Sequence, residues 1–218
     1  MIQKASESGQ KQIHVHIHDA QGGGTQYDEE LGAGSFFSVY HELFRTMFQP
    51  AKEVQRLIDD FLYRDPSLAP PGSLVEGQYS VAHYRAEYGR EVQRHAFLTN
   101  PNFIRKVAVN ALRCASELQD SDSSNPLPIY FASDNALALK VAREVAETTN
   151  YPIISFHRSE DSPLHLDYRG NVTTTPKDYY STFVDLYLAG SGKCVTHGRG
   201  GFGRFASLLS FNSSCSSK

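Results

Sequence analysis

The feature of this 218-residue chain that most constrains its fold is the alternation of short apolar runs with helix-forming segments after residue 77. The runs, bounded by turn residues, predict buried strands at Gln78–Tyr84, Pro128–Ser133, Tyr151–His157 and Lys193–His197. The segments with apolar residues at helical spacing predict helices at Pro101–Leu118, Ala136–Thr149, Pro176–Ala189 and Gly201–Phe211. Strands joined by helices of this length form right-handed crossovers, so the sequence predicts an α/β fold with a Rossmann-like, mainly parallel sheet.

Capping residues support three of these helices. Asn100 with Pro101 at the first helical position, Asp134 and Thr175 each stand where a helix is predicted to begin.

The residues before this alternation are predicted to form a partial N-terminal segment. Its elements are a strand at Gln12–His18, which alternates with period two, and helices at Phe36–Phe48 and Ala51–Tyr63. Three prolines and two glycines in Asp65–Gly77 predict a linker. The predicted division is therefore an N-terminal segment, 1–77, and a Rossmann-like domain, 78–218.

Charge and composition exclude some classes of function. The net charge is −3, and the largest basic group, Arg90, Arg94 and His95, is too small for a nucleic-acid surface. No run of 18 apolar residues occurs and the N-terminus is polar, so neither a signal peptide nor a membrane anchor is expected in this chain. Its three cysteines are too widely spaced for a disulfide framework or a C-x-x-C metal site.

Ligands of parallel α/β sheets bind at the carboxyl ends of the strands. The residues that follow the predicted strands are Arg85, Glu87, Ser133, Asp134, His157, Arg158 and His197–Gly201. We therefore expect the functional residues among them.

The last predicted strand is followed by Gly198-x-Gly200-x-x-Gly203. Such a turn brings backbone N–H groups close to phosphate oxygens, and the next helix directs its positive end at them, so a diphosphate would fit here. A dinucleotide-binding fold would need a further strand and an acid about 20 residues downstream, and a P-loop would need Lys-Ser/Thr after the glycines. Neither is present, and a tight turn that needs glycine only for close packing is the alternative.

His83 and Arg85 fall on one face of the first strand after the linker. An arginine at a strand's carboxyl end can bind a diphosphate through two hydrogen bonds and neutralise the charge that develops on a leaving group. The alternative for Arg85 is a surface ion pair with Glu87.

Two acids have less specific surroundings. Asp134 can cap its helix, bind a hydroxyl or amine at the sheet edge, or do both. Asp185 lies in an apolar helix, YYSTFVDLYLAG, where an unpartnered carboxylate is costly, so a ligand donor or a buried arginine is expected beside it.

Two possible metal sites are disfavoured. His14, His16 and His18 share a strand face, but a half-exposed polar face is the commoner reason for such a pattern. Asp120-Ser121-Asp122 lies in a polar loop at the amino end of a strand, where a solvated loop is expected.

Three segments together resemble a known family. VAHYRAEYG, IYFASDNALALKVA and DYYSTFVDLYLAGSGKCVTHGRGGFGRFASLLS resemble the three sequence blocks of GDP-fucose-dependent fucosyltransferases, the α1,6-, protein O- and plant O-fucosyltransferase-like group. The resemblance covers Gln78–Phe211, and FQPAKEVQRLIDDFL resembles the helix before the first block. It departs from some members in having glycines where they carry hydroxyl residues.

The resemblance implies the nucleotide-sugar-binding half of a GT-B fold and an inverting transferase that needs no metal. It implies that Arg85 binds the β-phosphate and assists departure of GDP, and that His83 and Asp185 hold guanine. Asp134 would lie near the nucleotide-sugar, while Gly200, Gly201 and Phe202 would offer backbone N–H groups to phosphate. These are the residues that we expect to form the site.

The partners implied are a GDP-fucose donor and a glycan or glycoprotein acceptor, in the Golgi or the lumen of the endoplasmic reticulum. By this resemblance, the chain would hold the donor-binding half of a GT-B enzyme and little of the acceptor-binding half. Glu87 and Glu91 are the candidates for the general base. Transfer of another nucleotide-linked sugar, or a catalytically silent nucleotide- or glycan-binding module, remain the alternatives.

Overall fold

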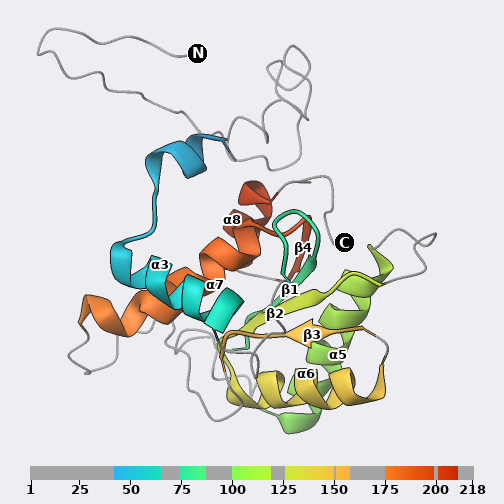
Figure 1. Ribbon diagram of the computed structural model, residues 1–218. Helices are drawn as coiled ribbons and strands as arrows, with labels where there is room; N and C mark the ends of the chain where they lie inside the picture. Colours follow the sequence, from blue (N-terminus) through green and yellow to red (C-terminus); the bar gives the residue numbers. More distant parts are fainter. Residues whose placement is uncertain are drawn as a thin grey trace, which may run out of the picture. The chain divides into compact units, whose positions relative to one another are not determined.

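A four-stranded, all-parallel sheet is the centre of this computed structural model (Figure 1). The structure describes residues 42–64, 74–86, 100–118, 126–149, 151–157, 175–198 and 201–210. The strands are β1 (Ser80–Tyr84), β2 (Ile129–Ser133), β3 (Ile153–Ile154) and β4 (Cys194–His197). Their order is β3-β2-β1-β4, which confirms the predicted α/β class and the parallel, Rossmann-like sheet.

The strands are apolar because both faces of the sheet are covered. Every residue of β1 and β2 is buried, as expected for a parallel sheet between two layers of helices. In the register of the sheet, Tyr84 lies opposite Ser133 and His83 opposite His197. The carboxyl ends of β1, β2 and β4 therefore lie level at one edge.

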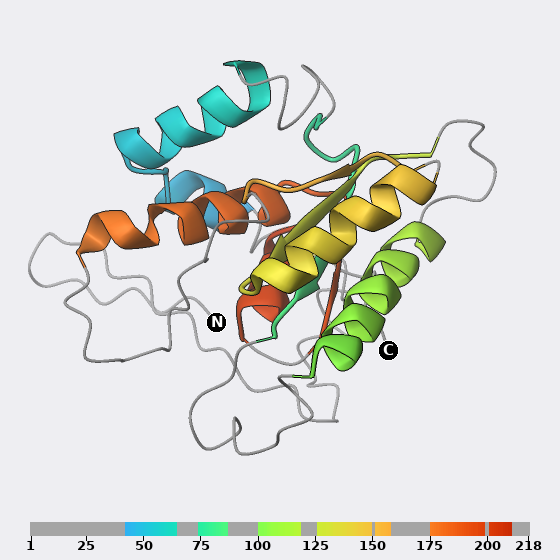
Figure 2. The same ribbon diagram turned by 90° about the horizontal axis from the view of Figure 1, so that it is seen from below.

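Helices lie on each side of the sheet (Figure 2). On one side, α5 (Pro101–Glu117) and α6 (Ala136–Thr148) bury Ala108 and Leu139 in one core with Phe131 of β2. On the other side, α3 (Lys52–Asp59), α7 (Tyr180–Gly190) and α8 (Gly201–Leu209) share a second core with Val81 and Tyr130. The fold has three layers, with a separate core on each face of the sheet.

Two of the predicted helix caps are confirmed. Asn100 begins α5, with its side chain accepting a hydrogen bond from the Asn102 amide at 2.9 Å. Thr175 precedes a 3-10 turn, η3 (Pro176–Tyr179), that leads into α7. The Asp178 carboxylate accepts from the Thr175 amide and hydroxyl at 2.6 and 3.0 Å, which fixes this start.

The predicted cap of α6 is wrong by one residue. Asn135 is the capping residue, and its side-chain oxygen accepts from the Ala138 amide at 3.2 Å. Asp134 and Asn135 are both residue types that cap well, and the sequence does not choose between them. The structure assigns Asp134 a different bond, described below.

The predicted elements and the observed ones differ mainly in length. The strand predicted at Tyr151–His157 is reduced to the two residues of β3, and the last helix ends at Leu209. The helix predicted at Ala51–Tyr63 is α3 followed by a π-helical turn, η1 (Asp60–Arg64). Of the earlier elements, the chain is helical over 42–47, and the strand predicted at Gln12–His18 lies outside the residues that the structure describes.

The helix α3 belongs to the same core as the sheet. Its buried Val54 and Ile58, with Phe61 of η1, pack in the cluster that contains Tyr130 and Val184. Part of the segment predicted to precede the Rossmann-like domain thus completes one face of that domain's sheet. The boundary at residue 77 stays a prediction.

Candidate functional site

The order of the strands creates one position where the direction of winding changes. The described helix that follows β1 is α5, on one face of the sheet, whereas β4, its neighbour, is followed by α8 on the other face (Figures 1 and 2). In open α/β sheets ligands bind outside the carboxyl ends of the strands at such a switch point. The carboxyl edge of β1 and β4 is therefore the candidate site.

His83 and Phe202 meet at this edge. The His83 ring, near the end of β1, stacks on the Phe202 ring in the first turn of α8, with centroids 5.0 Å apart and planes inclined by 29°. His83 is buried at 8% exposure, and Arg85, half-buried, is the first residue after the strand. His83 and Phe202 are 119 positions apart in the sequence. Both are predicted for the site, and the fold brings them into contact.

Gly203 allows α8 to lie directly on the strand ends. A Cβ at this position would be 2.5 Å from the His197 Cβ and 2.6 Å from the His83 Nδ1, distances that real side chains do not tolerate. The alternative explanation of the glycine pattern, close packing, therefore holds for Gly203.

The other described glycines of the turn are different. A Cβ added to Gly198 or Gly201 would meet nothing within 4 Å. The packing of the described chain does not account for these two glycines, and backbone at such positions is open to close approach by a ligand.

Asp134 reaches across from β2 to the chain that leaves β1. Its Oδ1 accepts a hydrogen bond from the Ala86 amide at 2.7 Å. Asp134 and the backbone beside Arg85 are therefore joined at the predicted edge.

Asp185 is buried on α7, and its carboxylate contacts two side chains of the protein. Its Oδ1 accepts a hydrogen bond from the Tyr130 hydroxyl at 2.5 Å, and its Oδ2 lies 3.2 Å from the His157 Nε2, within ion-pair distance. Tyr130 pairs with Val81, two residues before His83 along β1. The partners that we expected for this carboxylate were a ligand or an arginine, and the structure supplies a tyrosine and a histidine instead.

The three side chains form a buried polar network. Their exposures are 0% for Tyr130, 5% for His157 and 6% for Asp185. Burial and the Asp185 carboxylate beside it raise the pKa of Tyr130, so the phenol stays protonated and donates. Tyr130 is not among the residues predicted for the site; a tyrosine within a buried strand indicates that its hydroxyl needs a partner, but not which one.

Several predicted residues cannot be placed at the edge. Glu87 and Gly200, the alternative base Glu91, and Arg158 lie outside the described ranges, as do the disfavoured metal ligands near residues 14–18 and 120–122. Within the described ranges, no group of three or more His, Cys, Asp or Glu side chains could hold a metal ion. No helix in these ranges is long and apolar enough to cross a membrane.

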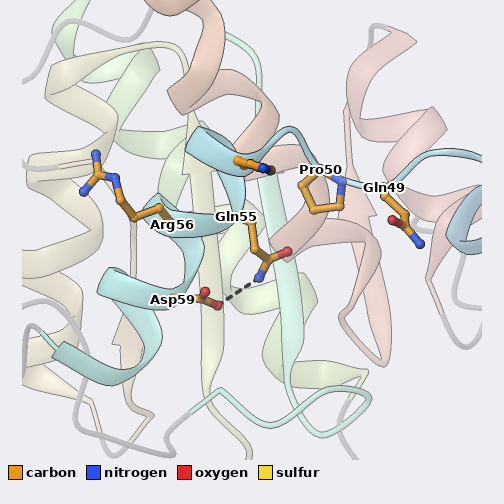
Figure 3. A pocket seen from close by; sticks show the side chains of 6 residues that line it. Gln49, Pro50, Gln55, Arg56 and Asp59 are labelled. Carbon is orange, nitrogen blue, oxygen red and sulfur yellow. Dashed lines mark hydrogen bonds between the residues drawn. The ribbon is translucent and has the colours of Figure 1, made fainter.

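A depression at the start of α3 is a separate feature (Figure 3). It is lined by Gln49, Pro50, Lys52, Gln55, Arg56 and Asp59. Gln55 donates to Asp59 at 2.8 Å, and Arg56 pairs with Asp60 at 2.7 Å. It shares no residue with the carboxyl edge, and these mutual bonds are typical of a solvated helix surface.

Comparisons with protein-family models, with curated proteins and with solved structures find no match to this chain. The fold and the geometry of the carboxyl edge are therefore the structural grounds for the function proposed below.

The contact at Gly203 can be tested by a single methyl group. Gly203→Ala should lower the free energy of unfolding by about 1–3 kcal/mol, because the added Cβ must push α8 away from His83 and His197. Gly201→Ala is the matched control, since its Cβ has open space, and it should stay within about 0.5 kcal/mol of the wild type. Urea denaturation measures both values, and equal stabilities of the two variants would contradict the close contact.

The buried network can be tested against a second buried tyrosine in the same core. Tyr130→Phe removes a donor to a carboxylate and should cost about 1.5–3 kcal/mol. Tyr79→Phe removes the hydroxyl that donates to the Leu188 carbonyl at 2.5 Å, a neutral acceptor, and should cost about 0.5–1.5 kcal/mol. A smaller loss for Tyr130→Phe than for Tyr79→Phe in urea denaturation would show that the Asp185 bond is not the stronger one.

Proposed function

We propose that this chain binds a nucleotide-sugar at the carboxyl edge of β1 and β4, as the donor-binding half of a GT-B-type, fucosyltransferase-like glycosyltransferase. The observation that carries the proposal is the switch point itself. It gathers His83, the backbone of Arg85 and the glycine-containing first turn of α8 at one edge of the sheet.

The diphosphate is assigned to the first turn of α8. The first N–H groups of a helix have no partner within the helix, and the helix dipole favours an anion at this end. Gly198 and Gly201 have no side chain to hinder the approach of phosphate oxygens. In this proposal Gly200, Gly201 and Phe202 provide the N–H groups, and Arg85 binds the same phosphates through its planar guanidinium.

The guanine of the nucleotide is assigned to the His83 side of the edge. The His83 ring stacks on the Phe202 ring, and this stacking holds His83 in one orientation for recognition of a purine. A guanine role for Asp185 would require one of its oxygens to exchange Tyr130 or His157 for the base, so that role stays a prediction. The proposal does not depend on it.

The reaction proposed is transfer of the sugar with inversion. An acceptor hydroxyl attacks the anomeric carbon as the bond from that carbon to the phosphate oxygen breaks, and the electron pair of that bond leaves with GDP. The hydroxyl proton passes to a general base, for which Glu87 is the first candidate. Arg85 and the helix N-terminus neutralise the negative charge that builds on the leaving β-phosphate. In this scheme they provide what a divalent cation provides in other transferases.

GDP binding is the experiment that tests the site. Calorimetry should show that GDP binds in the presence of EDTA, and that GMP binds at least about tenfold more weakly because it lacks the β-phosphate. UDP and ADP test recognition of guanine. A strict requirement for Mg²⁺ or Mn²⁺, or equal affinities for GDP and GMP, would contradict the assignment of the phosphates to Arg85 and α8.

Arg85 is the residue on which turnover should depend most. Loss of a charge-assisted contact to the leaving group costs about 2–4 kcal/mol, so Arg85→Ala should lower release of GDP from GDP-fucose by roughly a hundredfold or more. Arg85→Lys keeps the charge but not the planar fork and should restore only part of the rate. The rates are measured at saturating donor, with and without glycan acceptors.

The matched control for this change is Arg105→Ala. Arg105 lies on α5, where it pairs with Glu144 at 2.6 Å, and exposed pairs of this kind contribute little to stability. This variant should keep the wild-type rate. Normal turnover by Arg85→Ala, or its failure to fold while Arg105→Ala folds, would assign Arg85 a structural role. Binding of GDP without any release of it from GDP-fucose would identify a silent binding module.

A further inference from the structure

The hydrogen bond from the Ala86 amide to Asp134 has a consequence for Arg85. Asp134 follows β2 as Arg85 follows β1, and the last pair of the two strands is Tyr84 opposite Ser133. One residue beyond that pair, the Asp134 carboxylate accepts the Ala86 N–H at 2.7 Å. Arg85 is therefore held between two fixed points, the sheet at Tyr84 and the side-chain bond at Ala86.

We propose that Asp134 is a positioning residue, which sets the backbone of Arg85 at the carboxyl edge through the Ala86 amide. The inference rests on the proposed function only in assigning the diphosphate to Arg85. It replaces the direct contact with the nucleotide-sugar that the sequence resemblance implies for Asp134.

The chemistry of the bond makes the role specific. A carboxylate that accepts a backbone N–H forms a charge-assisted bond, which is stronger and shorter than a bond between neutral groups. Pairing of β1 with β2 ends at Tyr84 and pairing of β1 with β4 ends at His83, so the strand ladder does not reach the peptide that follows Arg85. An arginine bound to a phosphate through two hydrogen bonds has to keep its fork within a narrow range of positions, so loss of this anchor weakens the contact.

Asp134 is also available for this role because it is not needed to begin α6. The cap is Asn135, and its bond to the Ala138 amide does not involve the Asp134 side chain. Replacement of Asp134 should therefore leave the helix in place.

Positioning and direct contact make different demands on the side chain. To accept one N–H, an amide oxygen is enough, so Asp134→Asn should keep the bond to Ala86. A contact that depends on the negative charge, or on both carboxylate oxygens, should be lost in Asp134→Asn as in Asp134→Ala.

The experiment measures the Ala86 amide and nucleotide binding in the same variants of the full chain. In Asp134→Ala the Ala86 amide should exchange its hydrogen at least about tenfold faster, and the ratio of GDP to GMP affinities should fall by about the same factor, as for loss of one hydrogen bond to a charged group. Asp134→Asn keeps an acceptor oxygen without the charge, so both losses should be clearly smaller than in Asp134→Ala. Asn135→Ala, the control, should lower stability by about 1 kcal/mol and leave the affinity ratio unchanged.

A double-variant cycle identifies the route of the effect. If Asp134 acts through Arg85, Arg85→Ala combined with Asp134→Ala should be no worse in the GDP to GMP ratio than Arg85→Ala alone. Additive losses, or an Asp134→Asn variant as weak as Asp134→Ala, would overturn the inference in favour of direct contact with the donor.

Failure of the proposed function gives a separate signal. If the wild type binds neither GDP nor GMP, the site proposal is wrong, and the order of the Arg85 amide and Nε–H, measured by nuclear magnetic relaxation, still decides the positioning role. Lower order in Asp134→Ala than in the wild type and Asp134→Asn supports it, and equal order in all three overturns it.

Discussion

The contact of α8 with the ends of β1 and β4 is the constraint on which the candidate site depends. Because Gly203 has no Cβ, the first turn of α8 lies against His83 and His197, and this brings the Phe202 ring onto His83. The same contact directs the start of the helix at the edge where Arg85 leaves the sheet. A helix held further from the strand ends would lose the stacked pair, so one small residue sets how closely α8 approaches β1 and β4.

A second constraint is the buried polar network of Tyr130, His157 and Asp185, which lies further inside the fold than the carboxyl edge. Asp185 on α7 binds Tyr130 on β2 and lies beside His157, which follows β3, so three elements that are distant in sequence share one carboxylate. The His157 carbonyl in turn accepts from Ser155 at 2.9 Å and from Arg143 at 3.2 Å. These contacts join α7 and the residues that follow β3 to β2, the strand beside β1.

The elements of this fold follow from short-range signals, whereas the details of the site do not. Asn100 with Pro101 marks the start of α5, because its capping bond is made within two residues. Asn135 caps α6, whereas Asp134 accepts from the Ala86 amide 48 residues away, and no local pattern contains that bond. Tyr130 and Asp185 are 55 residues apart, and the apolar pattern that predicts their elements carries no information about where a phenol meets a carboxylate.

The glycine turn shows why the sequence alone left its meaning open. One spacing, Gly198-x-Gly200-x-x-Gly203, contains glycines that differ in what their missing side chain permits. At Gly203 it permits the protein's own close packing, whereas a Cβ at Gly198 or Gly201 would meet no atom of the described residues within 4 Å. A pattern of letters cannot separate these cases, since each requires only the absence of a Cβ. The distances separate them. Gly198 and Gly201 lie at the N-terminal end of α8, where the helix dipole favours an anion, and their backbone is open to the approach of a phosphate.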